Sequence, residues 1–361
     1  MPKRVKKVLL LNDYNLHEDR VRHAEGRLPN HLIFGLDKFH EFNLEFKLIR
    51  LWEPGIFYEL DNFFIEHKPF LPIGRLETQY KVLRQLNEVD AILSLKETES
   101  SMLNYLRAIG FLKVPVVTLV HHSQDIGRFN QFKHPIFKFL NMGSDAILSF
   151  SDKVVILSKR KKRKTIRWGP DLEYYSRLNP TFGNQIMTSG RAGRDFSTFA
   201  QSCIECKAHA KIMCLDYDVS PVFKTVNPFV EFEIGLQSQD QICRKLKGAL
   251  AIAIPMQDQE FTCGLTSFCD PLGLGKAVLV PENVGIDIDV EVHGIGKIVS
   301  PNNKQGWTNT LSWVKENKEE TKEMGKRARL FSEKNYNSKI FVNQISQVLH
   351  QVIQENEIAC S

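Results

Sequence analysis

The sequence from 262 to 280 reads TCGLTSFCDPLGLGKAVLV, and it follows an apolar run, ALAIAIP, at 249–255. Short apolar runs of this length, bounded by Gly, Pro and polar residues, are typical of buried strands. A second such run, AVLVP, occupies 277–281. The residues between the two runs have a helical pattern, so the order is strand, loop, helix, strand. This order predicts parallel strands joined by a right-handed crossover.

The same alternation occurs along the whole chain. We predict two doubly wound, Rossmann-like α/β domains that face each other across a cleft: an N-terminal domain at 1–165 and a C-terminal domain at 166–335. The final segment, 336–361, is expected to form a helix that packs back toward the first domain. Helical patterns such as HLIFGLDKFHEF (31–42) fill most gaps between strands. The candidate strands are 8–11, 45–51, 91–95, 114–120, 146–151, 153–158, 185–189, 210–215, 229–234, 249–255, 277–281 and 296–300.

Charge is unevenly distributed over the 361 residues. The net charge is +6, and residues 1–165 hold 27 Lys and Arg against 19 Asp and Glu. Six of these cations form one run, KRKKRK, from Lys159 to Lys164. The run fits a solvated linker or strand edge, and it equally fits contact with an anionic membrane surface. It lacks interleaved aromatic residues, so we expect no nucleic-acid partner.

Composition also bears on the compartment. No apolar run approaches the eighteen or so residues that a membrane-spanning helix needs. The basic start, MPKRVKK, is followed by an apolar stretch too short for a signal peptide. Seven cysteines, an odd number scattered over a long chain, favour a reducing environment. We therefore expect a cytoplasmic protein, with the basic run as a point of peripheral contact at the inner membrane face.

Ligands of open parallel sheets bind beyond the carboxyl ends of the strands, and one such loop reads GRAGRD, at 190–195. Gly190 permits a tight turn, and a helix is predicted to start at about Asp195, which would cap it. The helix N-terminus suits a phosphate, and Arg191 and Arg194 add bidentate donors. The alternative is a simple turn with two surface arginines.

The second such loop follows the run at 249–255. Gly264 permits close approach of a ligand, and Thr266 and Ser267 stand where a helix N-terminus would present hydroxyl and N–H groups. Asp270 follows Thr266 by one helical turn, so both are predicted to share a face. A carboxylate placed there can accept the two hydroxyls of a ribose. Two loops of this kind in one domain predict a site for a nucleoside diphosphate.

The first half has two loops of interest. In the first, Gly26 and Arg27 interrupt the chain, Asn30 is a plausible helix cap, and a helix is predicted from about His31. The second loop begins with the pair His121 and His122, at the end of a predicted parallel strand. Imidazole titrates near neutrality and can orient a sugar hydroxyl or a phosphate. A structural role for either histidine is the competing interpretation.

Three cysteines and a histidine lie close together in the sequence and raise the question of a metal site. Cys203, Cys206, His209 and Cys214 could be read as a zinc site. However, the segment holding the first three has helical periodicity, and Cys214 lies in an apolar strand, where small cysteines commonly serve as core residues. We therefore predict no metal.

Taken together, these segments resemble a known family. The chain is similar to GT-B fold glycosyltransferases of the retaining family four (glycosyl transferases group 1), in particular those that build bacterial surface polysaccharides. The resemblance covers nearly the full length and rests on the order and spacing of its segments: the loop and helix from Gly26, VPVVTLVHH (114–122), RWGPDLEYY (167–175), TSGRAGRDF (188–196), the 249–283 segment and MGKRARLFSEKNYN (324–337).

The resemblance implies a donor nucleotide on the C-terminal domain and an acceptor on the N-terminal one, with Gly26, Arg27, Asn30 and His31 in the acceptor-side loop. It implies that Gly190, Arg191 and Arg194 hold the diphosphate. Gly264, Leu265, Thr266 and Ser267 would meet the phosphates and sugar, and Asp270 the ribose. His121 or His122 would contact the transferred sugar. Such enzymes usually need no metal, because arginines and helix N-termini stabilise the leaving diphosphate.

Two departures from the family pattern stand in the donor segment. The family has two glutamates, and here Thr262 occupies the first position and Asp270 the second. Either Glu260 replaces the first glutamate through a shifted loop, or the donor sugar is contacted differently.

From the resemblance as a whole we predict a hexosyltransferase that moves a sugar from a nucleoside-diphosphate sugar to a glycan or lipid-linked acceptor. The alternative is a non-catalytic GT-B protein that binds a nucleotide sugar or glycan as partner of an active transferase.

Overall fold

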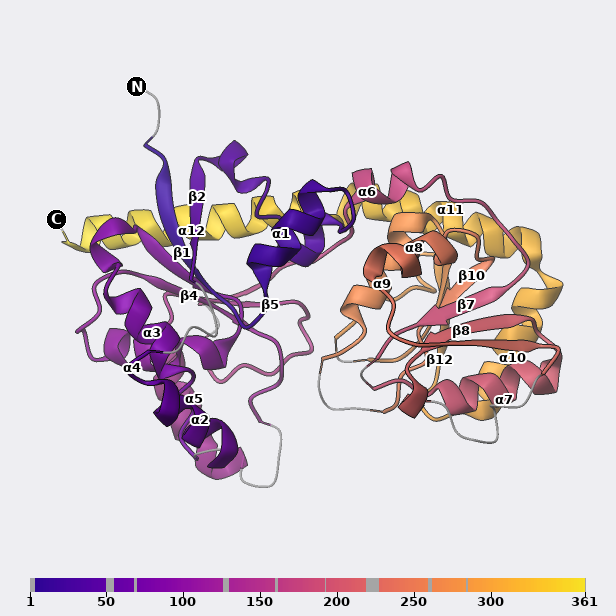
Figure 1. Ribbon diagram of the computed structural model, residues 1–361, viewed down its shortest axis with the longest axis horizontal. Helices are drawn as coiled ribbons and strands as arrows, with labels where there is room; N and C mark the ends of the chain where they lie inside the picture. The colour runs from indigo at the N-terminus through magenta and orange to yellow at the C-terminus, as the bar shows by residue number, and fades with distance from the viewer. Residues whose placement is uncertain are drawn as a thin grey trace. The chain divides into compact units, whose positions relative to one another are not determined.

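The computed structural model describes residues 4–49, 55–67, 70–125, 130–159, 162–191, 193–218, 227–258, 262–283 and 285–360. The chain forms two compact units, each built on its own sheet (Figure 1). The first unit comprises Met1–Val21, Ile33–Arg167 and Phe341–Ser361. The second comprises Arg22–Leu32 and Trp168–Ile340. The short segment Arg22–Leu32 therefore belongs to the second unit, although it lies between two parts of the first.

The first unit contains a six-stranded parallel sheet in the order β2-β1-β3-β4-β5-β6. The inner strands β1, β3, β4 and β5 are almost entirely buried, as expected when helices cover both faces of a parallel sheet. Helices α3 (Leu76–Leu83), α4 (Ser101–Ala108) and α5 (Asn130–Met142) lie together beside it (Figure 1). The strands are β1 (Lys6–Leu11), β2 (Leu44–Leu48), β3 (Ala91–Ser94), β4 (Val116–Val120), β5 (Ala146–Ser149) and β6 (Arg163–Thr165).

The second unit repeats the architecture with strand order β12-β11-β10-β7-β8-β9, again parallel throughout. The two predicted Rossmann-like sheets are confirmed. The strands are β7 (Ile186–Ser189), β8 (Ala210–Cys214), β9 (Val230–Ile234), β10 (Ala251–Ala253), β11 (Ala277–Pro281) and β12 (Gly296–Val299).

The described helices lie between these strands in the sequence, except the last three, which follow β12. They are α1 (Leu16–Ala24), α2 (Tyr58–His67), α3 (Leu76–Leu83), α4 (Ser101–Ala108), α5 (Asn130–Met142), α6 (Leu172–Arg177), α7 (Phe196–Cys206), α8 (Gln239–Leu246), α9 (Leu265–Leu274), α10 (Lys304–Glu316), α11 (Lys318–Asn335) and α12 (Ser338–Cys360), with short 3₁₀ turns at Asn30–Ile33, Phe39–Phe42, Leu86–Glu88, Glu97–Ser100 and Asp216–Asp218.

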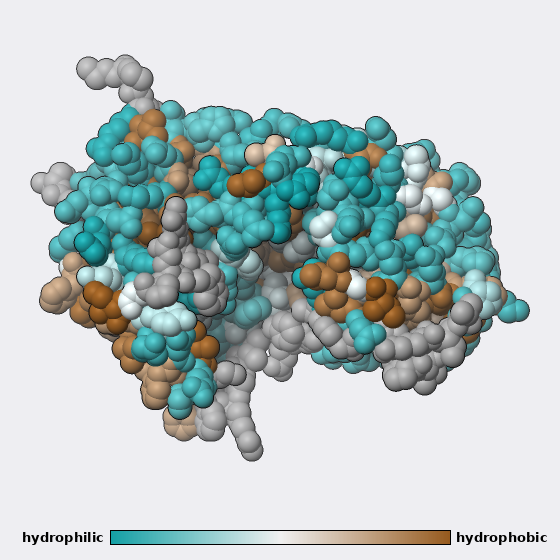
Figure 2. Space-filling model, in the orientation of Figure 1, coloured by the Kyte–Doolittle hydropathy of each residue, from teal (hydrophilic) through white to brown (hydrophobic). Residues whose placement is uncertain are grey.

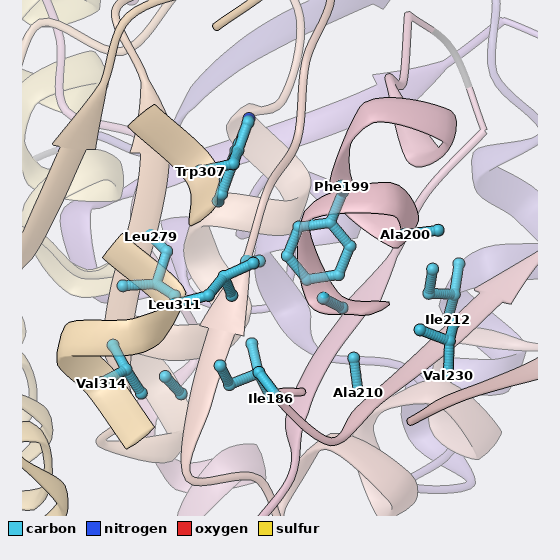
Figure 3. Packing of buried hydrophobic residues seen from close by; sticks show 14 of the residues in the cluster. Ile186, Phe199, Ala200, Ala210, Ile212, Val230, Leu279, Trp307, Leu311 and Val314 are labelled. Carbon is cyan, nitrogen blue, oxygen red and sulfur yellow. The ribbon is translucent and has the colours of Figure 1, made fainter. Parts of the chain in front are cut away.

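The sheet of the second unit is packed on both faces. Successive side chains of a strand point to opposite faces, so Ile186 of β7 joins one apolar cluster and its neighbour Met187 joins the other. The larger cluster lies between the sheet, α7 and α10 (Figure 3). There the rings of Phe199 and Trp307 meet edge to face, with centroids 5.3 Å apart. Both side chains are almost fully buried.

The C-terminal helix α12 contributes from Phe341 onward to the first unit. The Phe341 ring lies near those of Phe34 and Phe150, with centroids 6.5 Å and 6.4 Å away. The His350 ring is hydrogen-bonded to the backbone oxygen of Phe42 at 2.8 Å. The limits at Arg167 and Phe341 lie a few residues from those of the predicted domains at 1–165, 166–335 and 336–361, whereas Arg22–Leu32, predicted within the first domain, belongs to the second unit.

Two sequence predictions were wrong. The stretch 31–42, expected to be one helix, forms two short 3₁₀ turns, because Phe34 and Gly35 both have positive φ angles that interrupt a helix. The run at 153–158, expected to be a strand, is irregular. The edge strand is instead β6, formed by three residues that include part of the basic run.

Within the described part of the chain, no helix combines the length and the apolar character needed to cross a membrane.

Phe199→Ala should lower the free energy of unfolding of the second unit by about 3–5 kcal/mol, because it leaves a cavity between sheet and helices. Urea unfolding followed by circular dichroism measures the loss. The matched control is Phe111→Ala, since Phe111 is 80% exposed and contributes little to a core. Equal effects of the two substitutions would contradict the packing described above.

Candidate functional site

Two loops of the second unit meet at the carboxyl edge of its sheet. Strands β7 and β10 pair in parallel, with Thr188 opposite Ala253, so the loops that follow them leave side by side. Backbone hydrogen bonds then join the loops: the N–H of Asp195 donates to the oxygen of Pro255 and the N–H of Gln257 to the oxygen of Gly193, each at 3.0 Å. The two loops predicted to bind a nucleotide are therefore brought together.

Arg194 lies at the centre of this junction. Its guanidinium donates a hydrogen bond to the hydroxyl of Ser267, in the first turn of α9, at 2.7 Å. Burial lowers the pKa of Arg194 from its usual value, although a guanidinium remains charged at any physiological pH. The arginine side chain passes directly over Gly190, where a Cβ atom would overlap the guanidinium. A glycine is thus required at 190 for this position of Arg194.

Arg191 differs from Arg194. Its side chain is exposed and its guanidinium donates to the backbone oxygen of Gln237, just before α8, at 3.4 Å. The structure therefore brings only one of the two predicted arginines to α9. Asp195 caps α7 as expected, accepting a hydrogen bond from the N–H of Thr198 at 3.1 Å.

The N-terminus of α9 begins at Gly264, which has a φ angle of +85°. A side chain at this position would overlap the sulfur of Met256, and the conformation itself favours glycine. Because glycine has no side chain, it cannot cap the N–H groups of Leu265, Thr266 and Ser267 that open the helix. Such groups, with the positive end of the helix dipole, form an anion site.

Asp270 lies one turn further into α9 and is only 2% exposed. Its Oδ1 atom accepts three hydrogen bonds: from the Tyr175 hydroxyl at 2.7 Å, the Gln239 amide at 3.0 Å and the Cys243 thiol at 3.5 Å. Burial raises the pKa of Asp270 from 3.8 to about 6, while these bonds and the charge of Arg194 oppose the rise. The side chain is held firmly, and Thr266, expected on the same face, is exposed instead.

The network continues to the N-terminal segment. The ring of Tyr175 stacks against that of His31, with centroids 6.0 Å apart. The N–H of Asp171 donates to Nδ1 of His31, and the N–H of Asn30 donates to the carboxylate of Asp171. His31 is fully buried, which lowers its pKa to about 3.

Burial limits what the acceptor-side loop can contact. Asn30 and His31 are both within the packed interior of the second unit, so neither side chain is exposed to an acceptor in this structure. Arg27 is exposed and paired with Glu25. Gly26 has a φ angle of +72° and turns the chain. An acceptor contact stays a prediction for this loop.

The histidine pair lies in the first unit, directly after β4. The ring nitrogen Nε2 of His121 is 2.6 Å from the backbone oxygen of Leu95, and it must donate the proton because a carbonyl only accepts. Burial lowers the pKa of His121 to about 4, so the ring is neutral at pH 7. His122 is exposed. Glu260, the third predicted catalytic residue, lies outside the described residues.

Sequence reasoning missed a charged cluster beside His121. Strands β1, β3 and β4 are neighbours in the first sheet, and the residues that follow β1 and β3 include Asp13, Lys96 and Glu97. Lys96 and Asp13 form an ion pair at 2.6 Å. Glu97 is 9% exposed and accepts a hydrogen bond from the backbone of His121, yet burial raises its pKa to about 7. The rule that selected His121, polar residues at a strand's carboxyl end, also selects Lys96 and Glu97.

Comparison with known proteins identifies the fold of this chain. No family model matches the sequence, and no curated protein matches it. Among solved structures, HepE from Anabaena in complex with UDP has a TM-score of 0.66 at 14% identity, over 96% of this chain and 100% of HepE. Sucrose-phosphate synthase from Thermosynechococcus elongatus has a TM-score of 0.67 at 13% identity, over 97% and 100%. WaaG, a glycosyltransferase involved in lipopolysaccharide biosynthesis, gives 0.53 at 13%, over 95% and 99%.

The chain has the GT-B fold. The matching structures cover both units of the chain, so they support the sequence resemblance as far as the fold is concerned.

The raised pKa of Asp270 makes a prediction about stability. An acid whose pKa rises on folding stabilises the protein while protonated, below about pH 3.8, and loses that contribution as pH rises through about 6. The shift of about 2 units corresponds to about 3 kcal/mol. Relative to Asp270→Asn, which cannot ionise, the wild type should therefore lose about 3 kcal/mol between pH 4 and pH 7.5. Urea unfolding of both proteins at several pH values measures the difference, and a constant difference would contradict the raised pKa of the buried carboxylate.

Proposed function

We propose that this protein is a glycosyltransferase that takes a sugar from a nucleoside-diphosphate sugar. The observation that carries the proposal is the junction of Arg194 with the uncapped N-terminus of α9, at the carboxyl edges of two neighbouring parallel strands. HepE, a structural neighbour, has been solved with UDP and with UDP-glucose. A uridine diphosphate sugar is therefore the first donor to test.

The chemistry requires charge stabilisation. When an acceptor hydroxyl oxygen bonds to the anomeric carbon, the bond from that carbon to the diphosphate oxygen breaks, the electron pair stays on the diphosphate, and the hydroxyl proton passes to the leaving diphosphate oxygen. In our proposal the leaving diphosphate lies against Arg194, Gly190 and the N–H groups of the first turn of α9, which supply fixed positive charge without a metal. Arg191, exposed on the same loop, is proposed to add a second contact.

Asp270 is proposed to bind the ribose through its second oxygen. The three hydrogen bonds of its side chain all end on Oδ1. Oδ2 accepts none of the hydrogen bonds found among the described residues, so it can take those of the ribose hydroxyls. The protein donors on Oδ1 would then fix the direction of Oδ2. From the family resemblance we propose that transfer retains the configuration at the anomeric carbon.

The acceptor is proposed to bind the first unit near Lys96, Glu97, His121 and His122. Its proposed class is a glycan or lipid-linked precursor of a cell-surface polysaccharide, handled on the cytoplasmic side of a membrane. Lys96 offers a cation, His121 a fixed neutral ring and Glu97 a carboxylate that changes charge near neutral pH.

A second candidate function rests on Thr262. Where the family has its first glutamate, Thr262 offers a hydroxyl and no carboxylate. A protein that binds a nucleotide sugar or glycan without turning it over would be compatible with this substitution. Donor turnover separates the two functions, because a binding protein releases no nucleoside diphosphate.

Arg194→Gln should abolish donor-dependent stabilisation. At a concentration a hundred times the dissociation constant, UDP, or whichever nucleoside diphosphate the protein binds, should raise the free energy of unfolding of the wild type by roughly 2.7 kcal/mol. The variant removes the cation that faces the diphosphate, so its thermal shift with the same ligand should be near zero. A panel of UDP, GDP, ADP, dTDP and CMP identifies the base.

The matched control is Arg327→Gln, on α11, whose guanidinium binds Gly294 and Glu320 and should leave the ligand response intact. A full response of Arg194→Gln would place the diphosphate elsewhere. If no nucleotide stabilises the folded wild type, the proposal of a donor site is wrong.

Glu97→Gln should weaken acceptor use without affecting the donor. If Glu97 accepts a hydrogen bond from the acceptor hydroxyl, the change should raise the KM for the acceptor about tenfold and remove the rise in activity as pH increases through about 7. The thermal shift with the donor should stay that of the wild type. Glu88→Gln, at an exposed position, is the control. An unchanged pH profile in Glu97→Gln would remove Glu97 from the acceptor site.

A further inference from the structure

The sheet of the first unit ends at strand β2, which has a neighbour on one side only. The N–H of Lys6 in β1 donates to the backbone oxygen of Asn43 at 2.9 Å, so the backbone groups of Asn43 face β1. Alternate residues of a strand face alternate sides. The groups that face away from β1 are therefore those of Leu44, Phe46 and Leu48. Among the described residues, no hydrogen bond is found to these outward groups.

The sequence of β2, LEFKL, contains neither proline nor glycine, the residues that commonly interrupt an exposed sheet edge. The ring of Phe46 packs against that of Phe39, with centroids 4.5 Å apart. Phe46 and Leu48 are half-buried and line a groove of about 410 Å³ together with Leu36 and His40. A strand added at this edge would place its own side chains beside the groove.

The two charges of β2 make the strand complementary to itself. Glu45 and Lys47 are exposed and lie on the face opposite to Phe46. If two copies of β2 pair antiparallel about Phe46, Glu45 of each copy lies directly opposite Lys47 of the other. Opposite charges at directly facing positions stabilise a pair of strands, and like charges destabilise it. Self-complementarity of this kind is what a contact between two identical subunits requires.

The same charges select one register. Sliding one copy by two residues in either direction would place Glu45 opposite Glu45, or Lys47 opposite Lys47. Sliding it by one residue would set outward backbone groups against inward ones, and the hydrogen bonds would be lost. Only the pairing centred on Phe46 therefore satisfies both the backbone and the side chains.

The other outer strands of the two sheets lack this property. Strand β9, VEFEI, has the same alternation, but Glu231 and Glu233 would face each other in a self-pair, and both already contact Lys211. Strands β6 and β12 contain cations and no acidic residue. Strand β6 belongs to the basic run, in which Arg160 and Lys161 lie outside the described residues.

The surroundings of β2 do not oppose the pairing. Lys47 contacts Glu88 at 2.5 Å, but these side chains are 47% and 60% exposed, and such a surface pair contributes little. Figure 2 shows mostly hydrophilic residues over the region where Figure 1 places β1, β2 and α1. In that view no broad apolar patch there favours a different partner.

We propose that β2 pairs antiparallel with β2 of a second copy of this chain, across a two-fold axis at Phe46, so that the two sheets become one. The outward backbone groups supply the affinity, as in other cases of strand addition. The pairs between Glu45 and Lys47 supply the choice of partner and register. The proposal goes beyond glycosyl transfer and does not require it.

The test is sedimentation velocity of the full chain without nucleotide, over a roughly hundredfold range of protein concentration. The wild type should form a species of twice the chain mass as the concentration rises. Glu45→Lys and Lys47→Glu each place like charges opposite one another at two symmetry-related positions, so each should weaken the dimer about tenfold or more. The double variant, Glu45→Lys with Lys47→Glu, restores opposite charges and should dimerise within about threefold of the wild type.

An equimolar mixture of the two single variants gives the sharpest result. One chain then has two lysines on β2 and the other two glutamates, so a mixed dimer should form more tightly than either variant alone. Hydrogen exchange locates the contact, because the backbone N–H groups of 44–48 should exchange more slowly as the wild type dimerises.

The matched control reverses the charges of an exposed ion pair on α11, in Glu323→Lys and in Lys326→Glu. Neither change should alter dimerisation. A wild type that stays monomeric, single β2 variants that dimerise like the wild type, or a mixture without a mixed dimer would each overturn the proposal. So would a dimer whose formation leaves exchange at 44–48 unchanged, because another surface would then hold it together.

The two proposals fail separately. The β2 variants should keep the thermal response to the nucleoside diphosphate, which shows that their donor unit is folded. A wild type that dimerises through β2 but responds to no nucleotide would contradict the proposed function and leave the strand pairing standing.

Discussion

The parallel pairing of β7 with β10 decides where the candidate site lies. These strands are distant in sequence, yet their carboxyl ends adjoin in the sheet, and backbone hydrogen bonds continue the contact into the loops beyond. Arg194 can reach Ser267 only because of this pairing. A change that shifted the register of either strand would separate the arginine from α9, even if both loops kept their own shapes.

A second constraint is the burial of Asp270. A carboxylate in a packed interior is costly unless donors satisfy it, and Tyr175, Gln239 and Cys243 supply those donors. Tyr175 in turn stacks on His31. The segment Arg22–Leu32 is thereby tied into the second unit, so residues that the sequence assigned to the acceptor side serve the interior around the proposed ribose contact.

Much of the fold was predictable because it depends on local patterns. Apolar runs such as 249–255 and 277–281 predict buried parallel strands, and the helical pattern between them predicts a helix, which the structure shows as α9 between Gly264 and Gly275. The predictions failed where local pattern was not sufficient. The stretch 31–42 has apolar residues at helical spacing, but positive φ angles at Phe34 and Gly35 break it. The burial of Asn30 and His31 results from contacts with residues about 140 positions away, which no local pattern contains.

The site itself was predictable in part. The expectation that ligands bind beyond the carboxyl ends of parallel strands identified Arg194 and Ser267, which are hydrogen-bonded to each other. It also identified Arg191, which lies apart from them. It could have found Glu97, but carboxylates at loop starts are common, and only burial distinguishes this one.

The central claim is that the second unit holds a nucleotide sugar for transfer. The most direct measurement is release of nucleoside diphosphate from UDP-glucose and other sugar nucleotides, followed by mass spectrometry with the purified full chain. The account predicts release from one donor, slow with water as acceptor, and a loss of at least tenfold in Arg194→Gln. A donor that binds the wild type tightly but stays intact, with and without glycan acceptors, would contradict the account and identify a binding protein instead.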